Sequence, residues 1–140
     1  MKKTFLIAIA AFSFQLINDQ ALKTPAPSPT QTIKQDFGVS SLELSYSRPG
    51  IKGRKVFGDL VPFGKVWRTG ANSATTISFG SDVTIGGIAI KAGKYGVLTI
   101  PDKDNWTIII SKNTEVTSPA DYKENEDIAR VSVKPMTLKD

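Results

Sequence analysis

Beyond residue 30, apolar and polar residues alternate along the chain with a period of two. Leu42, Leu44 and Tyr46 are each separated by one polar residue, and the segment 75–79 repeats this pattern. Successive side chains of an extended strand point to opposite faces, so this period is typical of strands with one buried face. The pattern therefore predicts a fold built mainly from β-strands.

Turn-forming residues divide the chain into short elements. Gly86 and Gly87 lie between two short apolar segments, and paired glycines supply the positive φ angles of a tight hairpin turn. Ser118, Pro119 and Asp121 form the start pattern of a short helix, with an N-cap serine, a first-turn proline and a first-turn acid. The strands that we expect are 33–37, 42–46, 75–79, 83–85, 88–90, 93–100, 106–111 and 128–133.

These strands predict an all-β fold, an antiparallel β-sandwich or barrel of seven to nine strands, because they show no βαβ spacing. Eight alternating apolar residues are expected among the buried ones: Leu42, Leu44, Ile77, Phe79, Val97, Ile108, Ile110 and Val131. The chain stops a few residues after the strand 128–133, so the prediction allows for C-terminal truncation. A truncated domain would show an uncovered apolar face or an unpaired edge beside that strand.

The N-terminal residues predict export rather than a folded element. Lys2 and Lys3 precede an apolar run over 5–17, which suits a signal peptide and is too short to span a bilayer. The segment 22–30 is rich in proline and predicts an extended linker. We therefore divide the chain into a signal peptide (1–21), a linker (22–30) and a single β domain (31–140). This organisation predicts a periplasmic or extracellular protein without a membrane span.

Composition excludes several classes of catalytic and metal site. The chain contains neither His nor Cys, so the common zinc, copper and haem sites and the Ser-His-Asp or Cys-His nucleophile systems cannot form. We expect no metal and no cofactor, and this composition favours a protein that is not an enzyme. Oxygen-ligand metals, carboxylate pairs and a Ser–Lys dyad are the chemistries that the composition leaves open.

Positive charge is concentrated in one segment. The net charge is +5, and the residues 48–68 contain six basic side chains against the single acid Asp59. Such a local field favours anionic partners, and in an exported protein these are an anionic glycan or an acidic protein rather than nucleic acid. The ligand-binding residues that we expect are Arg48, Lys52, Arg54, Lys65, Trp67, Arg68 and Asn72.

Each of these candidates also has a purely structural interpretation. In the functional interpretation, Trp67 stacks on a sugar ring. In the structural interpretation, Trp67 belongs to the core and Arg68 pairs with Asp59 or Glu43. The cations between 48 and 54 would clamp a phosphate or carboxylate, or protect an edge strand. The segment 69–72 would bind an anion through its backbone N–H groups or serve only as a turn.

Catalytic candidates are few. Asp59 and Glu43 are the carboxylates that a two-carboxylate glycosidase would use, and Ser73 with Lys65 would form a dyad. A carboxylate-based hydrolase acting on cell-envelope or dietary polysaccharide is therefore the alternative to a non-catalytic binding or accessory module. The oligomeric state is left open.

The basic segment also carries a family resemblance. Several stretches resemble the secreted bacterial domain-of-unknown-function family 2911. They are SRP (47–49), KGR (52–54), FG (57–58), LVP (60–62), GKVWRTGAN (64–72) and ATT (74–76), with AGKY (92–95), TIP (99–101) and WT (106–107) further along the chain. The resemblance runs from about 28 to 135 and departs at 117–119, where the family tends to show Trp-Gly. It implies a secreted β domain that usually continues for several strands beyond 134, and it implies no activity.

From these patterns we expect the segment 48–72 to form one contiguous surface site. Glycines recur every few residues in this segment, so the chain is able to fold back on itself without strain. At least three of the side chains of Arg48, Arg54, Lys65 and Arg68 are expected to share a pocket or face with Asn72.

Overall fold

The computed structural model describes residues 24–136. The predicted signal peptide, 1–21, lies outside these residues. Eight strands are present in the described part of the chain: β1 (Thr30–Phe37), β2 (Ser40–Ser47), β3 (Thr76–Phe79), β4 (Val83–Ile85), β5 (Ile88–Ile90), β6 (Gly93–Ile100), β7 (Trp106–Ser111) and β8 (Asp127–Val133). Two short 3₁₀ helices, η1 (Pro119–Asp121) and η2 (Glu124–Glu126), precede β8. Every strand expected from the sequence is present, within a few residues at its ends.

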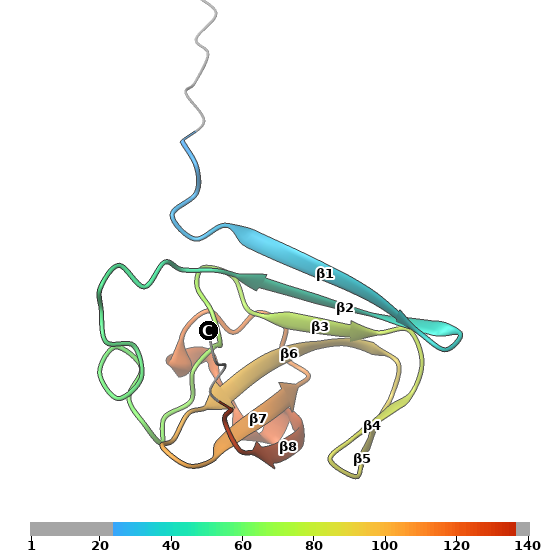
Figure 1. Ribbon diagram of the computed structural model, residues 1–140. Coiled ribbons are helices and arrows are strands. Elements are labelled where there is room, and N and C mark those ends of the chain that lie inside the picture. The colour runs from blue at the N-terminus through green and yellow to red at the C-terminus, as the bar shows by residue number, and fades with distance from the viewer. Residues whose placement is uncertain (1–23, 137–140) are drawn as a thin grey trace, which may run out of the picture.

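Six of the strands form one curved antiparallel sheet in the order β1-β2-β3-β6-β7-β8, and β4 and β5 form a separate hairpin (Figure 1). The long sheet is not closed into a barrel, so of the two predicted architectures an open, sandwich-like arrangement is the one observed. Among the described strands, β8 pairs only with β7 and lies at the sheet edge. None of the described residues forms a helix long and apolar enough to cross a membrane.

The turns form for the reasons that the sequence indicated. Gly86 and Gly87 have φ angles of 58° and 82°, which the β4–β5 turn requires. The Ser118 hydroxyl accepts a hydrogen bond from the Ala120 N–H, and the Asp121 carboxylate accepts one from the Ser118 N–H, which together cap η1. The Asp121 carboxylate also accepts hydrogen bonds from Thr117, and these bonds hold the pKa of Asp121 below its usual value.

The two faces of the sheet are buried to different extents. On one face Leu98, Ile109 and Val116 are almost fully buried, with exposed fractions of 2%, 0% and 1%. Val116 comes from the segment 112–126, which covers Leu98 and Ile109 together with the segment 61–70, and half-buried side chains of Val66 and Tyr122 complete the cluster. This is the better-packed face of the domain.

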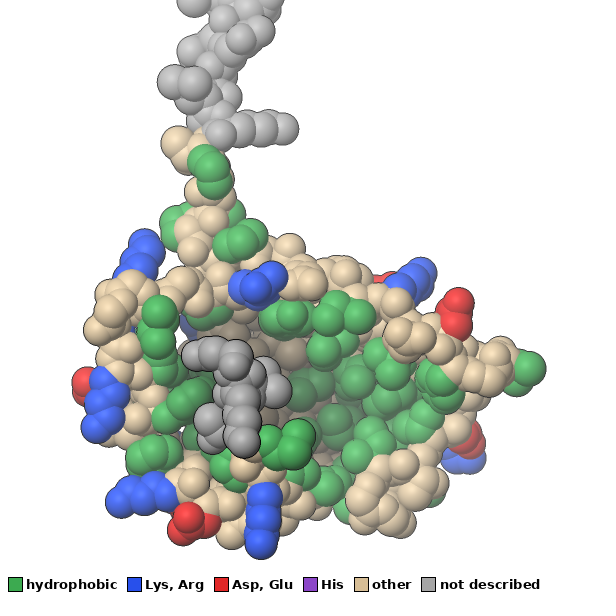
Figure 2. All heavy atoms as spheres, in the orientation of Figure 1, with side chains coloured by type: hydrophobic (Ala, Val, Ile, Leu, Met, Phe, Trp, Pro, Cys, Tyr) green, Lys and Arg blue, Asp and Glu red, His purple; other side chains and the backbone are tan. Residues whose placement is uncertain are grey.

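The opposite face is covered only in part. The β4–β5 hairpin packs on it through Ile90, which is buried against Phe79 and Ile110. The hairpin turn meets β8 directly, because a Cβ on Gly86 would come within 2.8 Å of the Val131 side chain. We call the surface that carries the apolar row Ile33–Leu44–Ile77–Tyr95 the open face. Figure 2 shows hydrophobic side chains gathered in a hollow, with charged side chains of both signs around it.

This partial cover corrects the predicted core. Phe79 and Ile110 are buried as expected. The other six residues are only half-buried, so the prediction for them is wrong: Leu42, Leu44, Ile77, Val97, Ile108 and Val131. Alternation correctly placed all eight on one face, but under the small hairpin only Phe79 and Ile110 are fully buried and the other six are covered in part.

Candidate functional site

The long connection from β2 to β3 lies at the end of the sheet opposite the β4–β5 hairpin (Figure 1). In the described part of the chain, the non-glycine residues with positive φ are Lys52 (49°), Thr69 (59°) and Asn72 (58°), and all three belong to this connection. A β-branched residue such as Thr69 rarely adopts this conformation, which costs free energy unless surrounding contacts enforce it. Sparsely populated backbone conformations of this kind cluster at functional sites.

Hydrogen bonds to neighbouring residues hold Thr69 in place. Its hydroxyl donates to the Trp67 carbonyl at 3.1 Å and lies 3.0 Å from the Thr99 hydroxyl. The Thr75 hydroxyl donates to the Thr69 carbonyl at 2.6 Å. Gly70 fits closely into the same turn, since an added Cβ would lie 3.2 Å from the Ser47 carbonyl oxygen. The turn predicted over 69–72 is therefore rigidly supported.

Trp67 joins the sheet and faces its open side. Its N–H and carbonyl form two backbone hydrogen bonds with Thr99, at 2.7 and 2.9 Å, which extend the pairing of β6. Phe57 stands between the two tryptophans, with ring centroids 5.8 Å from Trp67 and 4.8 Å from Trp106. Both contacts are edge-on, the arrangement that aromatic pairs prefer. Trp67 is half-buried, so it combines its predicted structural role with an accessible surface.

A cavity of about 1080 Å³ lies between this connection and the end of β2. Its apolar lining includes Tyr46, Val61 and Trp67, and we call it the basic cavity because four cationic side chains also line it. These are Arg48, Arg54, Lys55 and Arg68. No Asp or Glu is among its lining residues.

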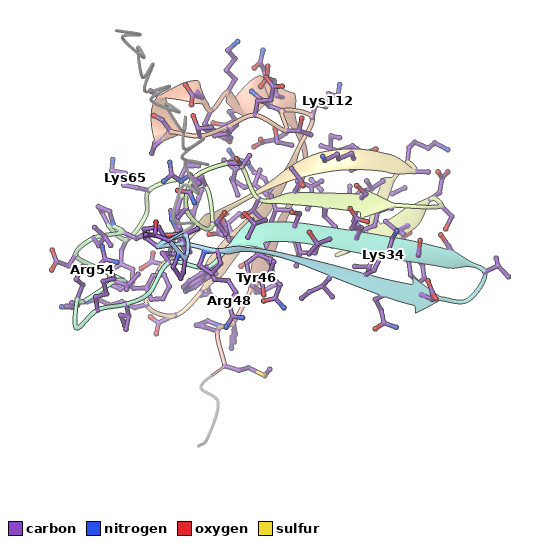
Figure 3. All side chains as sticks on the ribbon, turned by 90° about the horizontal axis from the view of Figure 1, so that it is seen from above. Lys34, Tyr46, Arg48, Arg54, Lys65 and Lys112 are labelled. Carbon is purple, nitrogen blue, oxygen red and sulfur yellow. The ribbon has the colours of Figure 1, made fainter. Side chains whose placement is uncertain are left out.

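The arginines of the basic cavity bind uncharged oxygens of the protein. Arg48 Nη1 donates to Gln31 Oε1 at 2.9 Å, and the Tyr46 hydroxyl donates to the same oxygen at 3.2 Å. Figure 3 shows Tyr46 and Arg48 close together at the end of β2. Arg54 donates to the carbonyls of Ile51 and Gly50, at 3.0 and 2.8 Å. None of these contacts neutralises the guanidinium charge.

Arg68 also lacks the carboxylate partner that the sequence suggested. Its guanidinium donates to the Thr117 carbonyl, on a segment far away in the sequence, rather than to Asp59 or Glu43. All ion pairs of the described residues lie elsewhere, on the cations Lys34, Lys91, Lys123 and Arg130. The six basic residues between 48 and 68 therefore have no ion pair within the described part of the chain.

The structure brings together some of the predicted site residues and separates others. Arg48, Arg54, Arg68 and Trp67 line the basic cavity, whereas Lys52, Lys65 and Asn72 do not. Lys65 projects from another part of the connection, away from Arg48 and Tyr46 (Figure 3). The Asn72 amide instead donates to the Ser28 carbonyl at 3.2 Å, which fixes the start of the domain against the turn.

The catalytic candidates lie outside the cavities. Glu43 pairs with Lys34 at 3.5 Å on the face of the sheet opposite Leu44, and Asp59 is exposed. Neither carboxylate lines the basic cavity. No hydrogen bond joins Ser73 to Lys65 among the side-chain contacts of the described residues. The described residues also contain no group of three acidic side chains placed to hold a metal ion.

Sequence reasoning missed three contributors to the basic cavity, Lys55, Tyr46 and Phe57. Lys55 was counted in the charge of the segment but not among the binding residues, and Tyr46 was assigned only to a strand face. The position of Tyr46 two residues before Arg48 is the signal that links it to the cavity, because alternate residues of a strand share one face. Phe57 was overlooked as a lining residue because nothing in the sequence pairs it with the two tryptophans.

A second cavity, of about 590 Å³, adjoins the first. Phe57 lines both, and Thr99, Trp106 and Ile108 line the second together with Val133. The pairing of Trp67 with Thr99 and of Thr99 with Ile108 places these side chains on the open face. The second cavity is therefore the part of the open face next to the basic cavity.

A separate polar cluster stabilises the end of the 3₁₀ segment. Asp127 Oδ2 accepts hydrogen bonds from the Tyr122 hydroxyl at 2.6 Å and from Arg130 Nε at 2.7 Å. Burial, together with the Asp127 carboxylate, raises the pKa of the Tyr122 hydroxyl. Tyr122 packs under the Ile109 core, and none of the three residues lines either cavity. We assign this cluster a structural role.

Comparison with known proteins gives one match. A search of the curated proteins and a search of the solved structures found nothing similar to this chain. A model of the family described as "Protein of unknown function (DUF2911)" matches residues 28–140. The match includes the whole sheet, both cavities and the basic connection, as the motifs in that connection led us to expect. The chain therefore belongs to the DUF2911 family.

Proposed function

We propose that this protein is an exported, non-catalytic binding module whose basic cavity holds an anionic glycan. The observation that carries the proposal is the lining of that cavity: four cationic side chains, aromatic and aliphatic surface, and no carboxylate. Ligand sites in proteins are typically concave and largely apolar, with a few polar groups that orient the ligand. A cavity of about 1080 Å³ is large enough for more than one sugar ring.

The charges of the cavity support an acidic ligand. Like charges held close together destabilise a fold unless a counter-charge relieves them, and the described residues provide none for this cluster. Guanidinium groups bind carboxylates through two parallel hydrogen bonds, which gives Arg48 and Arg68 a geometric preference for the carboxylate of an acidic sugar.

The aromatic residues favour a sugar over other anions. Trp67 and Tyr46 line the basic cavity beside the cations, and each offers an apolar ring together with a polar group. Sugar rings have apolar C–H faces and polar edges, so this combination suits them. A simple inorganic anion would not use the aromatic surface.

The arrangement supports binding rather than hydrolysis. A two-carboxylate hydrolase needs both acids beside the scissile bond, roughly 5–10 Å apart. Asp59 and Glu43 lie outside the basic cavity, and Glu43 is on the other face of the sheet. The proposal of export rests on Lys2, Lys3 and the apolar run 5–17.

Isothermal titration calorimetry with trigalacturonate and with the neutral trisaccharide galactotriose tests the proposal. We expect the protein to bind trigalacturonate and not galactotriose, and the double variant Arg54→Ala/Arg68→Ala to lose this binding. Circular dichroism would check that the double variant is folded. Absence of trigalacturonate binding would overturn the proposal, and binding of a poly-glutamate peptide in its place would identify an acidic protein as the partner.

A further inference from the structure

We infer that the glycan is lipid-linked, and that its acyl chain lies along the open face while its anionic sugar occupies the basic cavity. This inference rests on the proposed function and adds the class of ligand. Its basis is the continuity between a charged cavity at one end of the sheet and an incompletely covered apolar surface next to it.

The first step is that the open face begins where the basic cavity ends. Tyr46 lines the cavity, and Leu44 and Leu42 follow it on the same side of β2. At about 3.4 Å per residue, Tyr46 and Leu42 are about 14 Å apart along the strand. Phe57 lines both cavities, so its ring connects the basic cavity to the apolar side chains of the second cavity, at whose edge Asp102 and Lys103 also lie.

The second step is that the open face is apolar across several strands. Ile33, Leu44, Ile77 and Tyr95 are cross-strand neighbours from β1 to β6. Ile33 is 39% exposed and Leu44 and Ile77 are half-buried, unlike the residues of the opposite face around Ile109. Larger apolar patches at a protein surface mark interaction sites and ligand-binding grooves. Ile77 and Tyr95 pack partly against the hairpin cluster, so we assign the binding role to the partly covered end of the row around Ile33 and Leu44.

The third step is that the distribution of charge selects the occupant. Cations line the cavity at one end of the hollow, and the row Ile33–Leu44–Ile77–Tyr95 contains no charged residue. A ligand complementary to both parts has an anionic head and an apolar tail. An acidic sugar joined to an acyl chain has this pattern of charge, whereas a free polysaccharide would leave the open face in contact with water.

Alkyl glucuronides distinguish the contribution of the acidic sugar to the affinity from that of the alkyl chain. Binding of methyl β-D-glucuronide, octyl β-D-glucuronide and octyl β-D-glucoside would be measured by calorimetry, below the critical micelle concentrations. We expect the octyl glucuronide to bind more tightly than the methyl glucuronide by about tenfold or more, because each buried methylene adds to the affinity. The octyl glucoside, which lacks the charge, is expected to bind more weakly than the octyl glucuronide.

Variants of the open face test whether the acyl chain of the ligand binds there. Leu44→Thr is expected to reduce the gain from the octyl group by about threefold, since it removes apolar contact surface. Ile33→Thr, at a more exposed position, provides the same test if Leu44→Thr does not fold. Ser45→Ala, on the opposite face of β2, is the matched control. It should keep the full increase in affinity that the octyl group provides over the methyl group.

The outcomes distinguish this inference from the proposed function. Equal affinity for the methyl and octyl glucuronides would overturn the lipid-linked ligand and leave the anionic glycan in place. Equal affinity for the octyl glucoside and the octyl glucuronide would overturn the proposed function and this inference together. If Leu44→Thr and Ile33→Thr keep the full affinity difference between the octyl and methyl glucuronides, the acyl chain does not bind the open face. If the wild type forms a stable dimer that the same variants dissociate, the open face is instead an interface between two copies of the protein.

Discussion

The different burial of the two sheet faces predicts unequal effects of one substitution at two adjacent residues. Ile108 and Ile109 are neighbours in β7, so their side chains point to opposite faces. Ile109 is 0% exposed and packs with Leu98 and Val116, whereas Ile108 is half-buried beside the second cavity. Replacing each with Ala removes the same atoms from the same strand, so the loss of strand propensity is similar in the two variants.

The expected magnitudes follow from burial. Removing a fully buried isoleucine side chain down to alanine costs about 2–5 kcal/mol, and a rigid, well-packed site lies near the upper end. We therefore expect Ile109→Ala to lower the free energy of unfolding by about 4 kcal/mol. Ile108→Ala should lower it by about 2 kcal/mol, because the Ile108 side chain is only partly buried and loses less contact surface.

Equilibrium unfolding in urea measures both values, and equal m-values would show that the variants expose similar surface on unfolding. The conservative substitutions Ile109→Val and Ile108→Val should both lower the free energy of unfolding by a smaller amount. Ile109→Val should again have the larger effect. If Ile108→Ala destabilises the protein as much as Ile109→Ala, the open face is covered in solution, and the reasoning about its exposure is wrong.

Two further predictions concern the packing of the sheet and its dependence on pH. Gly96→Ala should prevent or severely weaken folding, because the new Cβ would lie 2.1 Å from the backbone carbonyl oxygen of Asn113. Circular dichroism and thermal unfolding would measure this effect, and a variant as stable as the wild type would contradict the prediction. The lowered pKa of Asp121 means that its ionised form stabilises the folded state above the usual pKa of an aspartate, and that this stabilisation is lost as the pH falls through the lower folded-state value. The melting temperature should therefore fall more steeply between pH 5 and about pH 2 in the wild type than in Asp121→Asn, and parallel curves would rule out this contribution.

The strands could be predicted because their determinants are local. Alternation placed Leu44 and Ile77 on one face, and the Gly86-Gly87 pair located the hairpin turn. Burial could not be predicted in the same way. Whether Ile108 or Ile109 is shielded depends on which distant segments cover each face, and the period-two pattern only separates the faces.

The candidate site was predicted in composition but only partly in geometry. The density of cations in 48–68 correctly indicated a shared cavity for Arg48, Arg54 and Arg68, but the prediction that Asn72 joins them there is wrong. The exclusion of Lys65 depends on how the connection folds back, because the positive φ angles of Lys52 and Thr69 set its direction. The Thr69 turn is held by contacts distant in sequence, such as that with Thr99, and the sequence carries no local signal for these contacts.

Two lysines of the basic segment provide the most direct test of the basic cavity. Lys55 lines the cavity and Lys65 does not, although both are exposed and neither has an ion pair among the described residues. The measurement is the dissociation constant for trigalacturonate in Lys55→Gln and Lys65→Gln at a fixed salt concentration. The account predicts weaker binding by about fivefold or more for Lys55→Gln, from the loss of one charge-assisted contact, and no change for Lys65→Gln. Equal dissociation constants for the two variants would contradict the assignment of ligand binding to the basic cavity.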